Sequence, residues 1–142
     1  MKGRVVLLLS TFPRLSESFI VNKFLGLVDA GWDVHVVSAY NDRKAWSMLP
    51  NLHRTKEIHQ RVHYNWCFRP AWLSGLLYPF ALLYCLFKNP GGTIRYLFRS
   101  SKRLGWKALK RFYMDFPIIA LNPDLIHYEF GATAVSRSDL GY

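Results

Sequence analysis

Residues 4–10 read RVVLLLS, an apolar and partly β-branched run that does not alternate with polar residues. Such a run is typical of a strand that is buried on both faces of a parallel sheet. Residues 33–39 (DVHVVSA) have the same character. Apolar residues recur at helical spacing between the two runs, at Phe19, Ile20, Phe24, Leu27 and Val28. The sequence therefore predicts a strand, a helix and a second parallel strand, with residues 4–10 as the central strand.

The ends of the predicted helix have their own signals. Pro13 breaks the apolar pattern after the first strand, and Ser16 is positioned to accept a hydrogen bond as the helix N-cap. Gly31 follows the last apolar position, where a left-handed residue closes many helices. We therefore expect a helix that begins near Ser16 and ends near Ala30.

Two further strands are predicted in the remaining sequence. Residues 61–66 (RVHYNW) alternate as a short third strand. Residues 124–128 (DLIHY) follow Asn122-Pro123, which ends a helical pattern, and read as a short buried strand. The fold class expected is α/β, a partial Rossmann-like, doubly wound parallel sheet with helices on both faces, in three α/β/α layers.

The 142 residues suit one domain, but the pattern stops early. Residues 132–142 read as the start of a helix after a strand, and no further strand follows. We therefore expect an incomplete domain whose last strand is an unprotected edge, prone to self-association.

Residues 71–87 contain no charged side chain and come close to the length of a membrane-spanning helix. Gly75 and Pro79 interrupt this run. A single crossing would sever a doubly wound domain that begins before it and resumes after it. The sequence therefore favours a buried or interfacial helix over a spanning one.

Basic residues dominate the segment 88–111, which has no acidic residue. Apolar residues recur there every three or four positions, which predicts an amphipathic helix, or a helix pair broken near Gly105. The net charge of +10 and the neighbouring aromatics favour an anionic membrane surface, although a solvated basic face is an open alternative. The membrane-surface candidates are Arg95, Arg99, Lys102, Arg103, Trp106, Lys107, Lys110 and Arg111.

Several classes of protein are disfavoured by what the sequence contains. Cys67 and Cys85 stand in apolar surroundings without metal-ligand or redox spacing, so both are expected to be reduced core residues, and no metal site is predicted. No motif of a specific nucleic-acid reader occurs. The apolar run after Lys2 and Arg4 is too short for a signal peptide, so a cytoplasmic location is expected, with peripheral binding to the inner face of the membrane.

Three stretches together resemble the glycosyltransferases of family 4, which have the two-domain GT-B fold. Residues 10–20 (STFPRLSESFI) are similar to the family pattern FP-x-x-SE-T-F-I, with Ser18 in place of Thr. The turn at residues 31–34 (GWDV) is similar to G-H-x-V, with Trp32 in place of His. Residues 122–131 (NPDLIHYEFG) are similar to PD-x-IH-x-HFG, with Glu129 in place of the second His. The resemblance spans residues 1 to about 135.

This resemblance implies that residues 1–142 are the incomplete N-terminal, acceptor-side domain of a retaining glycosyltransferase. The complete enzyme would move a sugar from a nucleotide-sugar donor to a lipid-linked, saccharide or polysaccharide acceptor. The donor would bind mainly to a second domain that this sequence lacks, so the chain alone is expected to be inactive and to need no cofactor. A non-catalytic membrane-surface adaptor or regulatory module is the alternative.

The resemblance also assigns candidate site residues, which follow predicted strands where parallel sheets collect ligands. His127 would lie near the transferred sugar as the catalytic candidate, and Ser16, Glu17, Glu129 and Gly131 would contact the acceptor. Each has a simpler alternative. His127 could be a packed imidazole, Glu129 a surface ion pair, and Glu17 a carboxylate favoured by the helix dipole.

Overall fold

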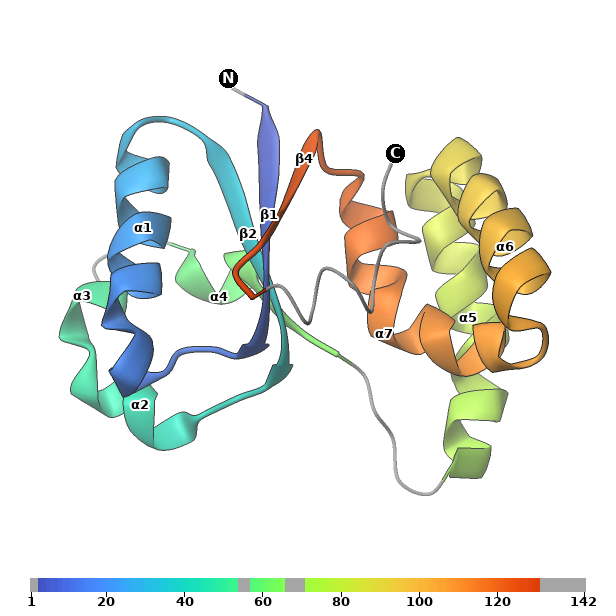
Figure 1. Cartoon of the computed structure of the whole chain (residues 1–142), viewed down its shortest axis with the longest axis horizontal. Helices are drawn as coiled ribbons and strands as arrows, with labels where there is room; N and C mark the ends of the chain where they lie inside the picture. Colours follow the sequence, from blue (N-terminus) through green and yellow to red (C-terminus); the bar gives the residue numbers. More distant parts are fainter. Residues whose placement is uncertain (1–2, 54–56, 66–70, 131–142) are drawn as a thin grey trace. The chain divides into compact units, whose positions relative to one another are not determined.

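The structure is a computed structural model that describes residues 3–53, 57–65 and 71–130. The chain divides into two compact units (Figure 1). The sheet unit contains the described residues up to 64 together with 123–130, and the helical unit contains those from 65 to 122. The described residues form an α/β fold with a four-stranded parallel sheet and seven α-helices, which is compatible with a Rossmann-like fold.

Four parallel strands form the sheet in the order β3-β2-β1-β4. They are β1 (Arg4–Thr11), β2 (Asp33–Tyr40), β3 (Val62–Tyr64) and β4 (Leu125–Tyr128). The four predicted strands are thus confirmed, although Trp66, at the end of the predicted third strand, lies outside the described residues. β1 is an inner strand with Val5 to Leu9 all buried, as its unbroken apolar run predicts.

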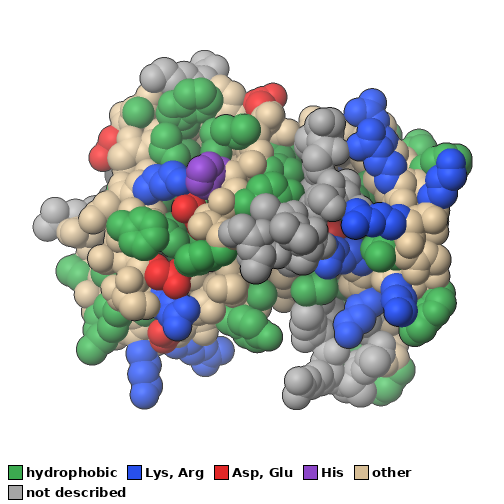
Figure 2. Space-filling model, in the orientation of Figure 1, with side chains coloured by type: hydrophobic (Ala, Val, Ile, Leu, Met, Phe, Trp, Pro, Cys, Tyr) green, Lys and Arg blue, Asp and Glu red, His purple; other side chains and the backbone are tan. Residues whose placement is uncertain are grey.

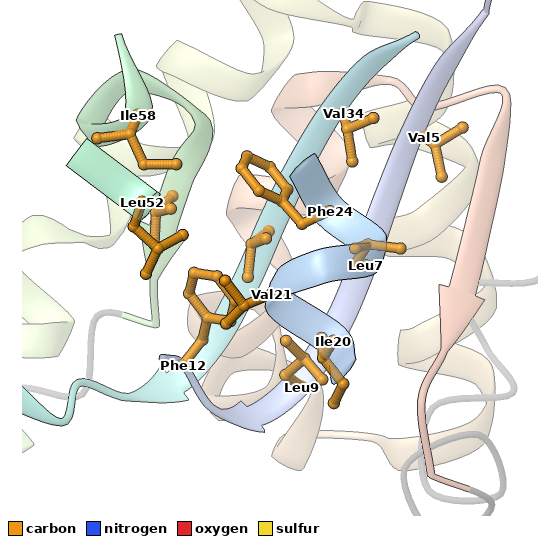
Figure 3. Close-up of a cluster of buried hydrophobic side chains, with 12 residues drawn as sticks. Val5, Leu7, Leu9, Phe12, Ile20, Val21, Phe24, Val34, Leu52 and Ile58 are labelled. Atoms are coloured by element: carbon orange, nitrogen blue, oxygen red, sulfur yellow. The ribbon is translucent and has the colours of Figure 1, made fainter. Parts of the chain in front are cut away.

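Helix α1 (Ser18–Asp29) packs on one face of this sheet. Leu7 and Leu9 of β1 meet Ile20 and Phe24 of α1 in the core cluster (Figure 3). Three short helices follow β2 and complete this unit: α2 (Arg43–Met48), α3 (Pro50–His53) and α4 (Ile58–Arg61). Leu52 and Ile58 bring them into the same core, because both side chains are buried there.

The start of α1 differs from the prediction, and its end does not. A 3-10 turn, η1 (Leu15–Glu17), precedes the helix, so Glu17 takes the N-cap position and Ser16 lies one residue too early to cap it. No side chain caps α1. At the other end Gly31 has φ +83°, which confirms the left-handed closing residue.

The helical unit contains α5 (Ala71–Lys88), α6 (Pro90–Leu104) and α7 (Lys107–Leu121), each in contact with the other two. The predicted break at Gly105 is confirmed, since this residue ends α6 with φ +54°. Asn89 caps α6 by accepting from Gly92 N at 3.0 Å, and its Nδ2 donates to Ile119 O at 3.0 Å. Buried Cys85 and Phe112 belong to the core of this unit, while Cys67 lies outside the described residues.

Two expectations about burial are wrong. β4 is an edge strand rather than a buried one, and Leu125 is 56% exposed. Helix α5 continues through Gly75 and Pro79, and much of its surface is exposed rather than buried. Among the described residues no helix is both long enough and apolar enough to cross a membrane. Whether helices cover both faces of the sheet, as the predicted three layers require, stays a prediction.

Candidate functional site

A polar cluster joins β4 to α1 at the edge of the sheet. Lys23 Nζ donates to His127 Nε2 at 2.7 Å and to Glu129 Oε1 at 2.9 Å. His127 pairs in register with Leu7, whose side chain packs against α1, so both side chains lie on the α1 face. Glu129 follows the carboxyl end of β4, where its N donates to Leu8 O at 3.4 Å. The fold thus gathers three ionisable groups at the carboxyl end of an edge strand.

The geometry of this cluster determines which atom of His127 carries a proton. A lysine ammonium can only donate, so Nε2 accepts and the neutral imidazole carries its proton on Nδ1. The Glu129 side chain is only 6% exposed, whereas that of His127 is 45% exposed. Glu129 therefore anchors Lys23 from within the protein, and the imidazole is the member of the cluster that a ligand can reach.

The other predicted site residues lie elsewhere. Glu17 pairs with Arg14 NH1 at 3.1 Å, and Ser16 is an exposed residue of η1. Among the hydrogen bonds and ion pairs of the described residues, neither is linked to the Lys23–His127–Glu129 cluster. Gly131 lies outside the described residues. The structure therefore brings His127 and Glu129 together and adds Lys23, which sequence reasoning missed.

A pocket beside β3 was also missed. It has a volume of about 350 Å³ and is lined by Asn41, Trp46, His59, Val62 and Tyr64. The rings of Trp46 and His59 lie 5.5 Å apart with 34° between their planes. Trp46 Nε1 donates to Asn41 Oδ1 at 3.0 Å and to the Tyr64 hydroxyl at 3.2 Å. No spacing in the sequence joins these residues, because they come from a loop, two short helices and a strand.

The Tyr64 hydroxyl connects this pocket to the loop that follows β1. It donates to Phe12 O at 3.0 Å, immediately before the cis peptide bond between Phe12 and Pro13. Burial raises the pKa of Tyr64 despite the hydrogen bond from Trp46, so the hydroxyl stays protonated at neutral pH. The pocket wall is therefore held by a chain of directed hydrogen bonds.

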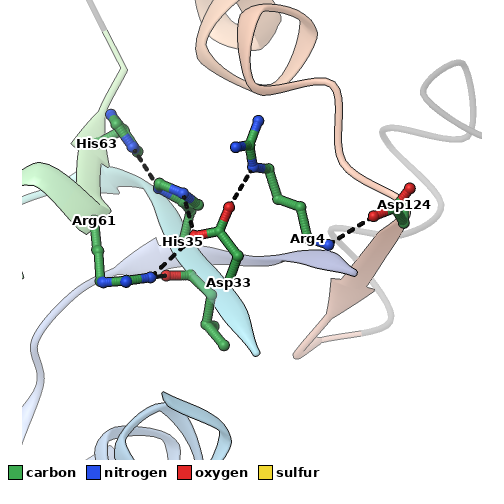
Figure 4. A network of polar contacts seen from close by, with 7 residues as sticks. Arg4, Asp33, His35, Arg61, His63 and Asp124 are labelled. Carbon is green, nitrogen blue, oxygen red and sulfur yellow. Dashed lines mark hydrogen bonds and ion pairs between the residues drawn. The ribbon is translucent and has the colours of Figure 1, made fainter. Parts of the chain in front are cut away.

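A second polar network ties the amino-terminal ends of the strands (Figure 4). Asp33, the first residue of β2, accepts from Arg4 Nε at 2.7 Å and from Arg61 NH1 at 3.1 Å. Asp124 accepts from Arg4 N at 2.6 Å, which extends the network to the start of β4. Burial alone would raise the pKa of Asp33, but the hydrogen bond from Arg4 and the neighbouring positive charges hold it below its usual value.

Two histidines extend this network along β2 and β3. His35 Nδ1 lies 3.1 Å from His63 Nε2, and His35 Nε2 lies 3.2 Å from Asp33 Oδ1. Burial lowers the pKa of His35 to about 4 despite Asp33, and burial also lowers that of His63. Both imidazoles are therefore neutral at pH 7. Among the described residues no group of three or more His, Cys, Asp or Glu side chains could hold a metal ion. Ligands of parallel sheets bind at the opposite ends of the strands, so we assign this network a structural role.

Comparison of the chain with known protein families, with curated proteins and with solved structures finds no match in any of the three.

Proposed function

We propose that this chain is the acceptor-side half of a retaining glycosyltransferase of the GT-B type. The observation that carries the proposal is the half-exposed imidazole of His127 at the carboxyl end of β4, held by Lys23 and Glu129. This histidine belongs to one of the three stretches that resemble family 4, and it lies at the sheet end where parallel α/β folds bind ligands. A parallel α/β sheet is compatible with the same reading.

In this proposal the three residues of the cluster have different roles. His127 contacts a hydroxyl of the sugar or acceptor, since it is the exposed member, while Glu129 fixes the Lys23 ammonium beside it. Ser16, Glu17 and Gly131 remain candidate acceptor contacts from the neighbouring loops. The nucleotide-sugar donor is a substrate held by a further domain, and no cofactor is required.

The pocket beside β3 supports a carbohydrate acceptor. Its volume of about 350 Å³ lies at the small end of the range for ligand pockets. The aromatic rings of Trp46 and Tyr64 offer apolar faces, and Asn41 and His59 add polar atoms. Such a mixture suits a sugar ring, which has apolar C–H faces and a rim of hydroxyls.

We also propose peripheral binding to an anionic membrane, on its cytoplasmic side. Figure 2 shows basic side chains gathered over α6. Seven of the eight predicted membrane-surface residues are exposed: Arg95, Arg99, Lys102, Arg103, Trp106, Lys107 and Lys110. Arg111 is the exception, because its Nε donates to buried Asp115 at 3.1 Å. Each basic residue near anionic lipid contributes about 1 kcal/mol of binding free energy.

The test is a transfer assay on a polypeptide that carries these residues together with a donor domain. In that protein, His127→Ala should lower kcat/KM by about 100-fold, with the melting temperature unchanged. Asn51→Ala, at an exposed residue of α3, is the control. Turnover that is unchanged in His127→Ala would remove this residue from the site.

The alternative function is a non-catalytic adaptor at the membrane surface, and the basic surface of α6 is the observation that favours it. The two functions differ in saccharide binding. Titration of the ¹⁵N-labelled chain with oligosaccharides should shift the resonances of His127 and the Trp46 indole if it is an acceptor-binding half. Vesicle binding without any saccharide-dependent shift would favour the adaptor.

A further inference from the structure

Helix α5 presents an apolar stripe along its whole exposed side. The stripe is formed by Trp72, Leu76, Phe80, Leu83, Tyr84 and Phe87, whose side chains are 50–86% exposed. These positions recur at intervals of three or four residues and so lie on one face of the helix. The opposite face carries Ala81 and Cys85, which are buried in the helical unit. We call the six residues the α5 stripe.

The stripe is longer and more apolar than the exposed face of an ordinary helix. It extends over about 22 Å, from the helical rise between its first and last residues. No charged residue lies in α5 before Lys88, its last residue. Large contiguous apolar patches on a protein surface mark contacts with other proteins or with membranes. Single exposed apolar residues would need no explanation, but six on one face require an occupant.

Charge identifies the class of that occupant. The next helix, α6, exposes Arg95 and Lys102, and the segment 88–111 contains no acidic residue. A second copy of the chain would bring the same excess of positive charge, since the net charge is +10. An anionic phospholipid surface offers negative headgroups for these residues and acyl chains for the stripe. Exposed Ile94 and Phe98 on α6 add further apolar contacts.

We propose that α5 lies in the plane of an anionic leaflet with its stripe embedded among the acyl chains, so that the helical unit is a monotopic membrane anchor. One-sided helices of this kind sink about 5–10 Å into the boundary between headgroups and acyl chains. This inference rests on the membrane partner proposed above, but not on transferase activity. It adds insertion to what the basic residues alone would supply by charge.

Insertion and charge attraction differ in their response to salt. Attraction between exposed basic residues and headgroups is largely screened in about 1 M salt, where the Debye length is about 3 Å. Burial of apolar side chains among acyl chains is not weakened by salt in this way. Membrane binding by the stripe therefore leaves a salt-resistant fraction, whereas binding by charge alone leaves none.

The experiment is flotation of the 142-residue chain with vesicles of phosphatidylcholine and phosphatidylglycerol, before and after the addition of about 1 M salt. We expect binding that persists in part at high salt. Phe80→Ser/Leu83→Ser should remove the salt-resistant fraction, since it places hydroxyls in the stripe. Arg95→Gln/Lys102→Gln should instead weaken binding at low salt. Met48→Ser is the matched control, because Met48 is as exposed as Leu83 (63%) but lies in the sheet unit.

Circular dichroism melting of every variant checks that folding is retained, which is expected because all these side chains are exposed. Two results would overturn the inference. One is binding that salt abolishes completely and that Phe80→Ser/Leu83→Ser does not change; the basic surface would then be a purely electrostatic contact. The other is a chain that ignores vesicles but sediments as a dimer that the stripe variant dissociates, which would make the occupant a second copy.

Discussion

Lys23 Nζ lies 2.7 Å from His127 Nε2, although the two residues are 104 positions apart in the sequence. Parallel pairing of β4 with β1 creates this contact, because it places His127 on the face of the sheet that α1 covers. The same ammonium is 2.9 Å from the nearly buried carboxylate of Glu129. The orientation of the candidate catalytic histidine therefore depends on one lysine of α1.

Replacing Lys23 tests this dependence. Lys23→Met should lower the free energy of unfolding by about 1–3 kcal/mol, because it leaves the buried Glu129 carboxylate without its cation. Urea unfolding measures the change, and Lys44→Met, at an exposed position of α2, is the control. The double variant Lys23→Met/Glu129→Gln should recover part of the loss, since a neutral amide is easier to bury. Equal unfolding of Lys23→Met and parent would show that the cluster does not stabilise the fold.

The tautomer of His127 is a second readout of the same contact. In the parent, ¹⁵N chemical shifts should show a neutral imidazole with the proton on Nδ1, since Lys23 donates to Nε2. In Lys23→Met both tautomers should be populated. A proton found on Nε2 in the parent would contradict the proposed arrangement.

The His35–His63 pair should make stability fall in mild acid. An unfolded histidine titrates near its ordinary pKa of 6.5, whereas the pKa of folded His35 is about 4. Between these values the unfolded chain binds more protons than the folded one, so stability decreases as pH falls from 6.5 towards 4. His63 contributes in the same direction, since burial lowers its pKa too.

Denaturant unfolding across this pH range tests the prediction with His35→Gln. The variant should show a shallower dependence on pH, because one of the two displaced titrations is gone. Its difference from the parent at about pH 8, where an unperturbed histidine is neutral, supplies the baseline for the lost contacts. An unchanged slope would mean that His35 titrates normally in the folded protein.

A buried carboxylate in the helical unit gives a third prediction. Asp115 is fully buried, and its Oδ2 accepts from the Tyr96 hydroxyl at 2.8 Å and from Arg111 Nε at 3.1 Å. Tyr96→Phe should cost about 1.5–3 kcal/mol of unfolding free energy, the usual worth of a hydrogen bond to a charged group. Tyr84→Phe removes a hydroxyl from a half-exposed tyrosine and should change little. Comparable losses in the two variants would contradict the role of the Asp115 contact.

The thiol of Cys85 should be unreactive in the folded chain. Burial raises its pKa to about 12, so almost no thiolate is present at neutral pH. In a Cys67→Ser background, a thiol reagent should modify Cys85 only as fast as the protein unfolds, and at once in denaturant. Rapid modification under native conditions would show that the core around Cys85 opens readily.

Helix capping supplies a matched pair of substitutions. Asn89→Ala should cost about 2–3 kcal/mol, because Asn89 caps α6 and also donates to Ile119 O and Asn122 Oδ1. Ser16→Ala should cost less than about 0.5 kcal/mol, because Ser16 caps nothing and is exposed. Thermal melting of both variants provides the comparison. A large loss in Ser16→Ala would restore the capping role that the sequence predicts.

Local patterns in the sequence predicted elements whose cause is itself local. The apolar runs of β1 and β2, the left-handed Gly31 and the break at Gly105 depend on the residues concerned and on their neighbours along the chain. The helix start was misjudged at Ser16 because a 3-10 turn was inserted, and capping signals do not reveal the length of such a turn.

Burial was the least predictable property, because it depends on what lies against a residue rather than on the residue. The apolar run of α5 was expected to be buried or interfacial, and β4 was expected to be a buried strand. Strand order places β4 at the sheet edge, and helix packing leaves one face of α5 exposed. Neither fact has a signature within the segment concerned.

The sequence by itself determined the parallel strand-helix-strand start, the basic helix pair and the importance of His127 as a candidate. Only the tertiary structure decided that Lys23 orients this histidine, that Glu129 is anchored inside, and that Trp46, His59 and Tyr64 share one pocket. The physical reason is range. Periodicity and capping act over a few residues, whereas these contacts join side chains that are far apart along the chain and meet only when the strands pair.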